Sequence, residues 1–525
     1  MQRAEREAIR IESVRPIVGM EIHVELATRT KLFTACPSGA ASLDEHGPNE
    51  LTDPVTLALP GALPVMNRDA VDRSIAVGLA LGCSIAERSR WDRKSYFYPD
   101  LPKAYQISQY DLPLCFDGAV DVPLMDQRGA FDLDGPTTRV RIIRAHLEED
   151  AGKLSHEAPG GGRIDHSLAD YTRAGTPLLE IVTAPDLSSA DQANALAQWL
   201  HRTIVFMGAS HGVMQRGHMR FEPNINCELS LEGGRVVRTP IVEVKNLNSF
   251  RALRGAIEYE LRVQPDRWRE DGREQGPGAK STRGWDEARG ATTPQREKED
   301  AHDYRYFPDP DLRTLRVSRE WVERVRAGLP ELPIERAKRY GREFGLAGGD
   351  ALLLTESLAV AQLFEATVGR AVRSGASAGE AGRLCANLLL QSGAKRANER
   401  GVSLGALLPG DNVAPALAGL IALRRDGSLS ASGADELFGA LLDAGGESFD
   451  PRAEAESRAL LLVRDEGQLT AWADEAISSQ PEIAEQIRGG SDKPIGRLVG
   501  AVMKASGGSA DAAMVRAMIL ERLGR

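Results

Sequence analysis

The segment GMEIHVEL, residues 19–26, alternates apolar and polar side chains as a half-buried β-strand does. In a strand, Glu21, His23 and Glu25 face one side, while the apolar residues between them face the other. The apolar side can pack on a core, and the polar side presents an imidazole between two carboxylates. This segment therefore predicts a sheet with one buried face and one face that carries chemistry.

The segment HLEEDAGK, residues 146–153, repeats this pattern. With the same period of two, His146, Glu148 and Asp150 share one side of a second strand. If the sheet brings the two polar rows together, they can hold a divalent cation. Carboxylates suit magnesium or manganese, and an imidazole shifts the preference toward manganese or zinc. The alternative is a pair of polar faces without a metal, ion-paired to the arginines before this segment: Arg139, Arg141 or Arg144.

The composition is that of an ordinary globular protein, with 42% hydrophobic and 27% charged residues among 525. The polar start and the lack of an apolar run near roughly 20 residues argue against a signal peptide and a membrane span. Five scattered cysteines without a CxxC pair argue against a disulfide framework or a zinc knuckle, and favour the cytoplasm. A net charge of −10 does not suggest a general nucleic-acid binder, although local basic clusters decide such binding.

The chain is long enough for two or three domains. Short alternating or apolar runs between Pro and Gly predict an α+β catalytic domain with a mixed sheet at 1–317. Segments with helical spacing follow, which predict an all-helical domain at 318–405 and a small helical tail domain at 406–525. Within the first part, residues 188–208 predict a helix capped by Ser188 or Ser189. Residues 264–302 are polar and aperiodic and predict a long surface loop, either freely mobile or covering a substrate.

Known nucleotide-binding motifs are missing from the sequence. The segment GPGAKST, residues 276–282, has alanine where a P-loop needs glycine before the lysine, and no strand precedes it. Nucleotide chemistry here therefore requires carboxylates that hold a metal, which in turn holds phosphates. The segment 92–114 interleaves basic and aromatic residues, which suits an anionic ligand with a ring. Its cofactor-binding candidates are Lys94, Lys103 and Gln106; the alternative is a rigid Pro/Tyr-rich loop packed on the sheet.

Seven segments of the chain form a recognisable series: VGMEIHVEL, LALPGALPVMNRDAV, DRKSYFYPDLPKAYQISQYDLPL, HLEEDAGKLSH, DYTRAGTPLLEIVTAPD, VEVKNLNSFRALRGAIEYE and EDAHDYRYFPDPDL. In this order they resemble the B subunit of the aspartyl/glutamyl-tRNA(Asn/Gln) amidotransferase (the GatB/GatE family). The C-terminal segment 494–523 resembles the tail domain of that family.

The resemblance implies a ligase with a glutamine synthetase-like catalytic domain. Members of this family use ATP and Mg²⁺, with Mn²⁺ as an alternative, to phosphorylate the side-chain carboxylate of Glu-tRNA(Gln) or Asp-tRNA(Asn). Ammonia from the amidase, which is the A subunit of the complex, then displaces phosphate, and the small C subunit joins the other two. The helical half is expected to bind the tRNA; candidate contacts are Lys395, Arg396, Arg400, Lys493, Arg497 and Lys504.

The resemblance also implies roles for individual residues. The metal ligands of the family match Glu21, His23, Glu148 and Glu180, of which alternation alone had not indicated Glu180. Lys94 is implied to lie near the reacting centre, with Tyr96 beside it and Glu148 as a catalytic residue. Arg173 is implied to clamp phosphate or the substrate carboxylate, or else to form a structural ion pair. Auxiliary positions, or ligands of a second cation, are Glu25, Glu149 and Asp150.

The sequence departs from the commoner family pattern in three places. Only Cys36 stands where some members carry a zinc-binding cysteine cluster, so we expect no zinc there. The segment 218–230 replaces a more usual strand, and Pro265 stands where many relatives continue a helix. These changes leave open which tRNA is served. Two alternatives are a stand-alone carboxylate–amine ligase and a tRNA-binding scaffold without activity; the four ligand matches disfavour the scaffold, and the helical tail disfavours the stand-alone ligase.

Overall fold

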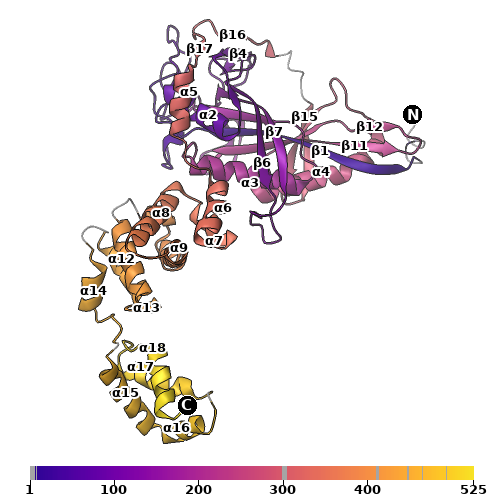
Figure 1. Ribbon diagram of the computed structural model, residues 1–525. Coiled ribbons are helices and arrows are strands. Elements are labelled where there is room, and N and C mark those ends of the chain that lie inside the picture. Colours follow the sequence, from indigo (N-terminus) through magenta and orange to yellow (C-terminus); the bar gives the residue numbers. More distant parts are fainter. Residues whose placement is uncertain are drawn as a thin grey trace. The chain divides into compact units, whose positions relative to one another are not determined.

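The computed structural model describes residue 6 and residues 9–297, 304–408, 413–445, 449–463, 465–491 and 493–525. The chain divides into two compact units, Met1–Pro333 and Ile334–Arg525 (Figure 1). The first unit contains the sheet, and the second contains helices. All five cysteines are free and buried.

The first unit is built around one mixed sheet of 13 strands. Neighbouring strands within the sheet pair antiparallel, except β13 and β14, which run parallel. The main path, in spatial order, is β15 (Ala291–Glu297), β14 (Ser281–Asp286), β13 (Val242–Lys245), β11 (Met219–Leu231), β1 (Ile11–Glu25), β10 (Pro177–Thr183), β7 (Thr137–Glu149), β5 (Tyr105–Ser108), β4 (Asp92–Ser95) and β16 (Phe307–Pro308). Three further strands join it at the sides: β12 (Val236–Arg238), β2 (Ser84–Ile85) and β6 (Cys115–Pro123).

Two small pairs and several helices complete this unit. The pairs are β8 (Lys153–Glu157) with β9 (Arg163–Asp170), and β3 (Arg88–Ser89) with β17 (Leu315–Arg316). The helices are α2 (Arg68–Ala80), α3 (Ala190–Phe206), α4 (Phe250–Asp271) and α5 (Arg319–Ala327), with short 3₁₀ turns at Gly39–Ala41 and Met214–Arg216. The α+β class expected from the sequence is confirmed.

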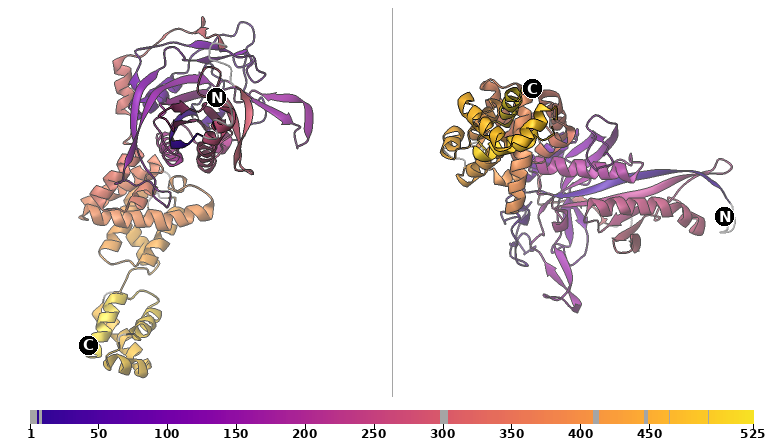
Figure 2. Two further views of the ribbon diagram at one scale, coloured as in Figure 1. Left: turned by 90° about the vertical axis from the view of Figure 1, so that its right-hand side faces the viewer. Right: turned by 90° about the horizontal axis from the view of Figure 1, so that it is seen from below.

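The core lies between one face of the sheet and helices α3 and α4. The apolar residues Met20, Ile22 and Val24 of β1, and Leu26 just after it, are at most 1% exposed. Burying each such side chain contributes roughly 1.5–3 kcal/mol relative to leaving it in water. Helix α4 packs against β11, the strand next to β1 (Figures 1 and 2). The alternating sequence therefore buries one face and leaves the polar face of β1 for the site.

Both core helices begin at a serine cap. The side chain of Ser189 accepts a hydrogen bond from the backbone N–H of Gln192, and Ser249 does the same for Ala252. Such caps satisfy backbone donors that the first helical turn leaves unpaired. The prediction of a capped helix within 188–208 is confirmed, with Ser189 as the cap.

The prediction of a surface loop at 264–302 is wrong for most of its length. Helix α4 continues to Asp271 through Pro265, and the hairpin of β14 and β15 follows; residues 298–302 lie outside the described residues. The amphipathic signal is missing because the buried face of the helix is polar here. Glu260 is fully buried, 3.1 Å from Arg267 and 3.3 Å from Arg283, and Gln264 donates to the carbonyl of Ile225.

The second unit contains helices and no named strand within its described residues. Its last helices enclose a core of their own that includes Leu469, Leu498, Val502 and Ile519. No single described helix combines the length and apolar composition of a membrane span; only α7 and α8, bent by 111°, reach both when taken together. The elements are α6 (Pro333–Phe344), α7 (Gly348–Leu354), α8 (Leu358–Arg373), α9 (Ala378–Asn387), a π-helix (Leu388–Gly393), α10 (Ala394–Arg400), α11 (Leu404–Leu407), α12 (Val413–Arg425), α13 (Ala431–Asp443), α14 (Pro451–Ser457), α15 (Glu466–Ser479), α16 (Pro481–Arg488), α17 (Ile495–Ala505) and α18 (Ala512–Arg522).

Candidate active site

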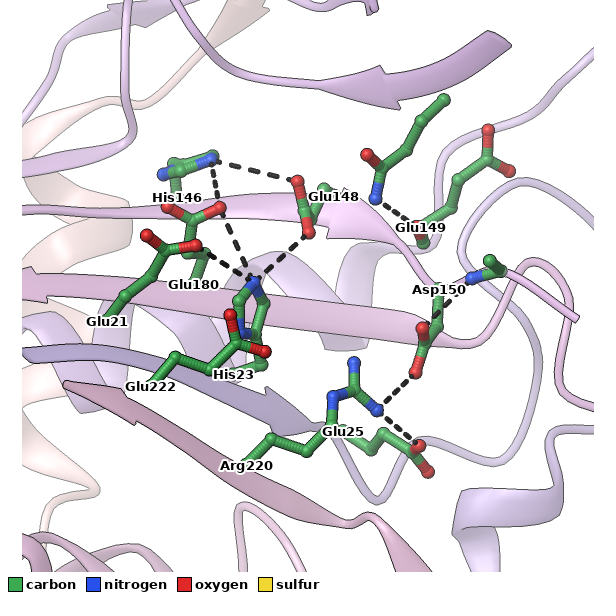
Figure 3. Close-up of polar contacts among 12 residues, drawn as sticks. Glu21, His23, Glu25, His146, Glu148, Glu149, Asp150, Glu180, Arg220 and Glu222 are labelled. Carbon is green, nitrogen blue, oxygen red and sulfur yellow. Dashed lines mark hydrogen bonds and ion pairs between the residues drawn. The ribbon is translucent and has the colours of Figure 1, made fainter. Parts of the chain in front are cut away.

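Strand pairing sets His23, Glu180 and His146 in a row across the sheet (Figure 3). His23 of β1 lies opposite Glu180 of β10, and Glu180 lies opposite His146 of β7. Glu21 and Glu148 are each two residues along their strands from a histidine, so they share the same face. The antiparallel register therefore collects on one surface the residues that alternation had placed on separate strands.

The side chains of these five residues converge on one point. The Nε2 atom of His23 is 3.7 Å from Glu21 Oε1, 3.8 Å from Glu148 Oε1 and 3.7 Å from Glu180 Oε2. The Nε2 atom of His146 is 3.5 Å from Glu180 Oε2 and 4.0 Å from Glu148 Oε2. These separations are longer than an ordinary hydrogen bond of about 2.7–3.2 Å. The groups thus face one another across a small space.

That space fits a divalent cation. Ligands bound at about 2.0–2.2 Å lie roughly 3–4 Å from one another, which matches the observed separations. Two overlapping groups have donor atoms within 4.8 Å of one another: Glu21, His23 and Glu180, and His146, Glu148 and Glu180. The three carboxylates suit magnesium or manganese, and the two imidazoles shift the preference toward manganese or zinc.

The charges of the cluster are only partly balanced. Burial, together with the charge of Glu180, raises the pKa of Glu148 to about 7. Burial lowers the pKa of His146 to about 4. Burial also disfavours protonated His23, but Glu180, Glu222 and Glu21 outweigh it and raise the pKa of His23 to about 9. Binding of a divalent cation would replace the protons that now compensate the carboxylates.

Four of the predicted catalytic and cofactor residues line one cavity, which measures about 240 Å³. They are Lys94, Tyr96, Gln106 and Glu148, and the rest of the wall includes Glu21, His23 and Glu180 of the cluster. The Nζ atom of Lys94 is 4.9 Å from the centre of the Tyr304 ring. Burial disfavours the ammonium, but Glu148 and its neighbours hold the pKa of Lys94 above its usual range. Lys94 is therefore a fixed positive charge beside the carboxylates.

Lys103 and Arg173 have contacts outside the lining of this cavity. Lys103 forms a close ion pair with Glu149, whose Oε1 also accepts a hydrogen bond from the backbone N–H of Ile107 at 3.0 Å. Arg173 donates to the carbonyls of Ala151 and Gly152 at 3.0 and 2.8 Å. These contacts stabilise the loop after β7; the cofactor role of Lys103 and the catalytic role of Arg173 stay predictions.

The sequence analysis did not select three charged residues that line the cavity: Arg220, Glu222 and Lys245. The Nη1 atom of Arg220 is 3.0 Å from Asp150 Oδ2 and 3.4 Å from Glu25 Oε1 (Figure 3). Lys245 Nζ is 2.6 Å from Glu222. Period-two alternation along 219–226 would have placed Arg220 and Glu222 on one face, but without a histidine the pattern did not stand out.

The arginines of β7 do not neutralise the cluster as a group. Arg139 and Arg141 pair with Asp121 at 3.0 Å and with Asp186 at 2.6 Å. Of the three, Arg144 reaches the cluster, with Nη2 3.8 Å from Glu180 Oε1. The alternative of ion-paired polar faces therefore holds for Arg144, while Arg139 and Arg141 pair elsewhere.

Comparison with protein families finds a match in each of the two units. The GatB/GatE catalytic domain matches residues 16–323, and a GatB domain matches residues 370–523. The chain belongs to the GatB family. The first match covers all residues of the site on the sheet, and the second covers most of the helical unit.

Curated members of the GatB family are similar over almost the entire chain. Relatives from Herminiimonas arsenicoxydans and Variovorax paradoxus are 42% and 43% identical, covering 97% of this chain and 99% of each relative. A relative from Rhodopirellula baltica is 38% identical over 98% of this chain and 97% of its own length. All three are named as the B subunit of the aspartyl/glutamyl-tRNA(Asn/Gln) amidotransferase.

Proposed function

We propose that this chain is the ATP-dependent component of a tRNA amidotransferase. It converts Glu-tRNA(Gln) to Gln-tRNA(Gln), Asp-tRNA(Asn) to Asn-tRNA(Asn), or both, and is thus a ligase that forms a carbon–nitrogen bond. The observation that carries the proposal is the convergence of Glu21, His23, Glu148 and Glu180 with Lys94 in one cavity. Family membership and the names of the relatives support tRNA as the carrier of the substrate.

The reaction proceeds through an acyl phosphate. The side-chain carboxylate of the charged amino acid attacks the terminal phosphorus of ATP, and ADP leaves. Ammonia then attacks the acyl carbon, inorganic phosphate leaves with the bonding electron pair, and the nitrogen loses a proton to give the amide. A free carboxylate is a poor electrophile toward ammonia, and its negative charge is repelled by the phosphates of ATP. Charge neutralisation and positioning therefore account for most of the catalysis.

The residues of the cavity match these demands. Glu21, His23, Glu148 and Glu180 would hold Mg²⁺ or Mn²⁺, which supplies positive charge to the phosphates when bound. Lys94, beside the carboxylates, adds a second positive charge and orients the anionic groups. Gln106, whose side-chain amide donates to the carbonyl of Glu149 at 2.8 Å, keeps the end of β7 in place.

The same reaction also suggests a fold relationship, partner proteins and a location for this chain. We propose a fold relationship between the first unit and glutamine synthetase, which uses the same route. The partners are the amidase that releases ammonia (the A subunit), the small C subunit, and aminoacyl-tRNA held by the helical domains at 318–405 and 406–525. Of the basic candidates for tRNA contact, Arg396 and Arg400 already pair with Asp435 at 2.7 Å and Asp443 at 2.8 Å. The cytoplasm is the proposed location.

Amide formation on each mischarged tRNA tests the proposal. The chain is assayed with and without its partner proteins, with Mg-ATP and ammonium chloride as the nitrogen donor. Glu148→Gln removes one carboxylate of the cluster, and we expect ATP-dependent conversion to fall at least about 100-fold. Glu157→Gln, the same change on the exposed hairpin of β8 and β9, is the matched control and should leave the rate unchanged.

Two outcomes would replace the proposal with an alternative. Conversion of neither tRNA by the complete complex, with tRNA binding retained, identifies a scaffold. ATP-dependent amidation of free glutamate or aspartate, without binding of tRNA in a gel shift, identifies a stand-alone ligase. The preferred tRNA in the successful case defines the substrate.

A further inference from the structure

A cavity of about 330 Å³ is lined by the second half of α4 and by residues of β13, β14 and β15. We call it the α4 cavity. Of the residues that the structure describes, none lines both this cavity and the one around Lys94. The segment GPGAKST, which lacks the pattern of a P-loop, contributes Ala279 and Thr282 to its wall. The α4 cavity is therefore separate from the metal cluster.

One face of α4 turns polar and aromatic side chains toward this cavity. The four residues that the helix contributes are spaced three, one and three apart, so they share one face: Gln264, Arg267, Trp268 and Asp271. A helix packed on a sheet ordinarily has aliphatic residues at such positions. This face instead combines one large packing side chain with groups that can bind a polar ligand.

The α4 cavity has a buried floor and an exposed rim. Gln264, Trp268 and Thr282 are at most 2% exposed. Asp271 and Arg273, which carry opposite charges, are exposed. A small molecule can therefore enter from solvent and lose most of its water at the floor.

The wall between floor and rim carries a surplus of positive charge. Arg267 and Arg283 share one carboxylate, that of Glu260, at 3.1 and 3.3 Å. Burial and the charge of Arg267 lower the pKa of Arg283, as expected where two guanidinium groups have one counter-charge. Arg283 donates from Nε and Nη2 to Thr292, at 2.8 Å each, and its Nη1 group has no hydrogen-bond partner among the described residues. One guanidinium is thus available to an anion.

Two buried donors in the floor also lack a partner among the described residues: Nε1 of Trp268 and Oγ1 of Thr282. Buried donors in native proteins are nearly always paired, with protein or with water. Because both residues line the α4 cavity, an acceptor bound there can pair with them. Pro240, Val242 and Ala279 add apolar surface to the same cavity. The lining therefore suits an anion that has an apolar body.

We propose that the α4 cavity binds a small organic carboxylate, with its charged group at Arg283 and its body against Val242 and Trp268. A carboxylate carries one negative charge, which matches the surplus of one guanidinium. Its two oxygens accept hydrogen bonds from a guanidinium and from other donors at once. A phosphate ester with two negative charges would leave one of them unbalanced. The site is separate from that of the proposed amidation and does not depend on it.

Fluorine NMR of the full-length chain with para-fluorobenzoate tests this inference. The chain is first dialysed free of divalent cations, so that a metal in the carboxylate-rich cavity does not attract the probe. We expect a dissociation constant of about 1 mM or lower. The uncharged para-fluorobenzamide, which has nearly the same shape, should bind at least about tenfold more weakly.

Two substitutions locate the probe. Ala279→Leu fills the cavity and should weaken binding of para-fluorobenzoate at least about tenfold. Thr282→Val keeps the shape of the side chain and removes the hydroxyl, so binding should weaken about threefold. The melting temperature of Thr282→Val should not fall, because that hydroxyl has no partner among the described residues. Ala288→Leu, at an exposed position of the same hairpin outside the lining, is the matched control and should leave the affinity unchanged.

Four results would overturn the inference. A wild-type chain that does not bind para-fluorobenzoate lacks the site. Equal affinity for the amide contradicts recognition of an anion. Unchanged binding in both Ala279→Leu and Thr282→Val places the probe elsewhere on the chain. Displacement of the probe by an equal concentration of inorganic phosphate identifies a general oxyanion site instead of a carboxylate site. None of these results affects the proposed amidation, which is measured separately with Mg-ATP and tRNA.

Discussion

Glu180 lies directly opposite His23 in the pairing of β10 with β1, and its Oε2 atom is 3.7 Å from Nε2 of that histidine. The same oxygen is 3.5 Å from Nε2 of His146 on the other side. Glu180 therefore belongs to both groups of candidate metal ligands, whereas Glu21 belongs to one.

This shared position predicts unequal effects of two similar substitutions. Glu180→Gln should weaken Mn²⁺ binding by more than about 100-fold, because both groups lose a ligand. Glu21→Gln should cost less, because His146, Glu148 and Glu180 remain. Titration of Mn²⁺ by electron paramagnetic resonance measures both affinities. Equal losses would contradict a site centred on Glu180.

The raised pKa of Glu148 predicts a pH dependence of stability without metal. Burial, with the charge of Glu180, moves this pKa from 4.5 to about 7. The folded state then binds the proton more tightly than the unfolded state, so the contribution is fully present below pH 4.5 and is lost as the pH rises through 7. In Glu148→Gln the side chain has no proton to lose, so its contribution does not change with pH. At pH 8 the free energy of unfolding of Glu148→Gln should therefore exceed that of the wild type by up to about 3 kcal/mol.

Thermal melts between pH 5 and 8 in the presence of a chelator check this expectation. The gap between variant and wild type should widen with pH, and added Mn²⁺ should raise the melting temperature of the wild type more than that of the variant. A constant gap across the range would show that the carboxyl of Glu148 does not titrate there.

The two lysines of the segment 92–114 are expected to have different roles: Lys94 in the reaction and Lys103 in the stability of the fold. Lys94→Met removes a positive charge from the cavity wall, so amide formation should fall at least about 100-fold while the chain stays folded. Lys103→Met leaves Glu149 buried beside an apolar side chain, which should lower the free energy of unfolding by about 3 kcal/mol. Adding Glu149→Gln to Lys103→Met should restore much of that stability. Rates and urea unfolding curves for the three variants separate a role in the reaction from a role in stability.

Arg220 is expected to stabilise the end of the site nearest Asp150. It contacts two buried carboxylates, Glu25 and Asp150, so Arg220→Met should destabilise the first unit by about 3 kcal/mol. Arg173 remains 3.6 Å from Asp150 and limits the loss. A double-mutant cycle with Asp150→Asn measures the coupling, and additive effects would mean that the two side chains do not interact in solution.

The position of helix α4 shows where local patterns mislead. Gln264 and Glu260 occupy its buried face, so the usual apolar periodicity is missing and residues 264–271 read as loop. Their burial is possible because Arg267 and Arg283, the latter from β14, compensate Glu260. Such compensation depends on partners from another element, which a pattern within one segment does not contain.

Alternation along β1 and β7 by itself determined that Glu21 and His23 share a face, as do His146 and Glu148, because the period of two is a property of every extended backbone. The family resemblance of the sequence added Glu180, which no local pattern distinguishes. Only the tertiary structure placed Glu180 between the two histidines and brought Arg220 and Lys245 to the same cavity. The physical reason is that these strands are far apart in the chain, and their register is set by packing the apolar faces of the whole sheet against α3 and α4.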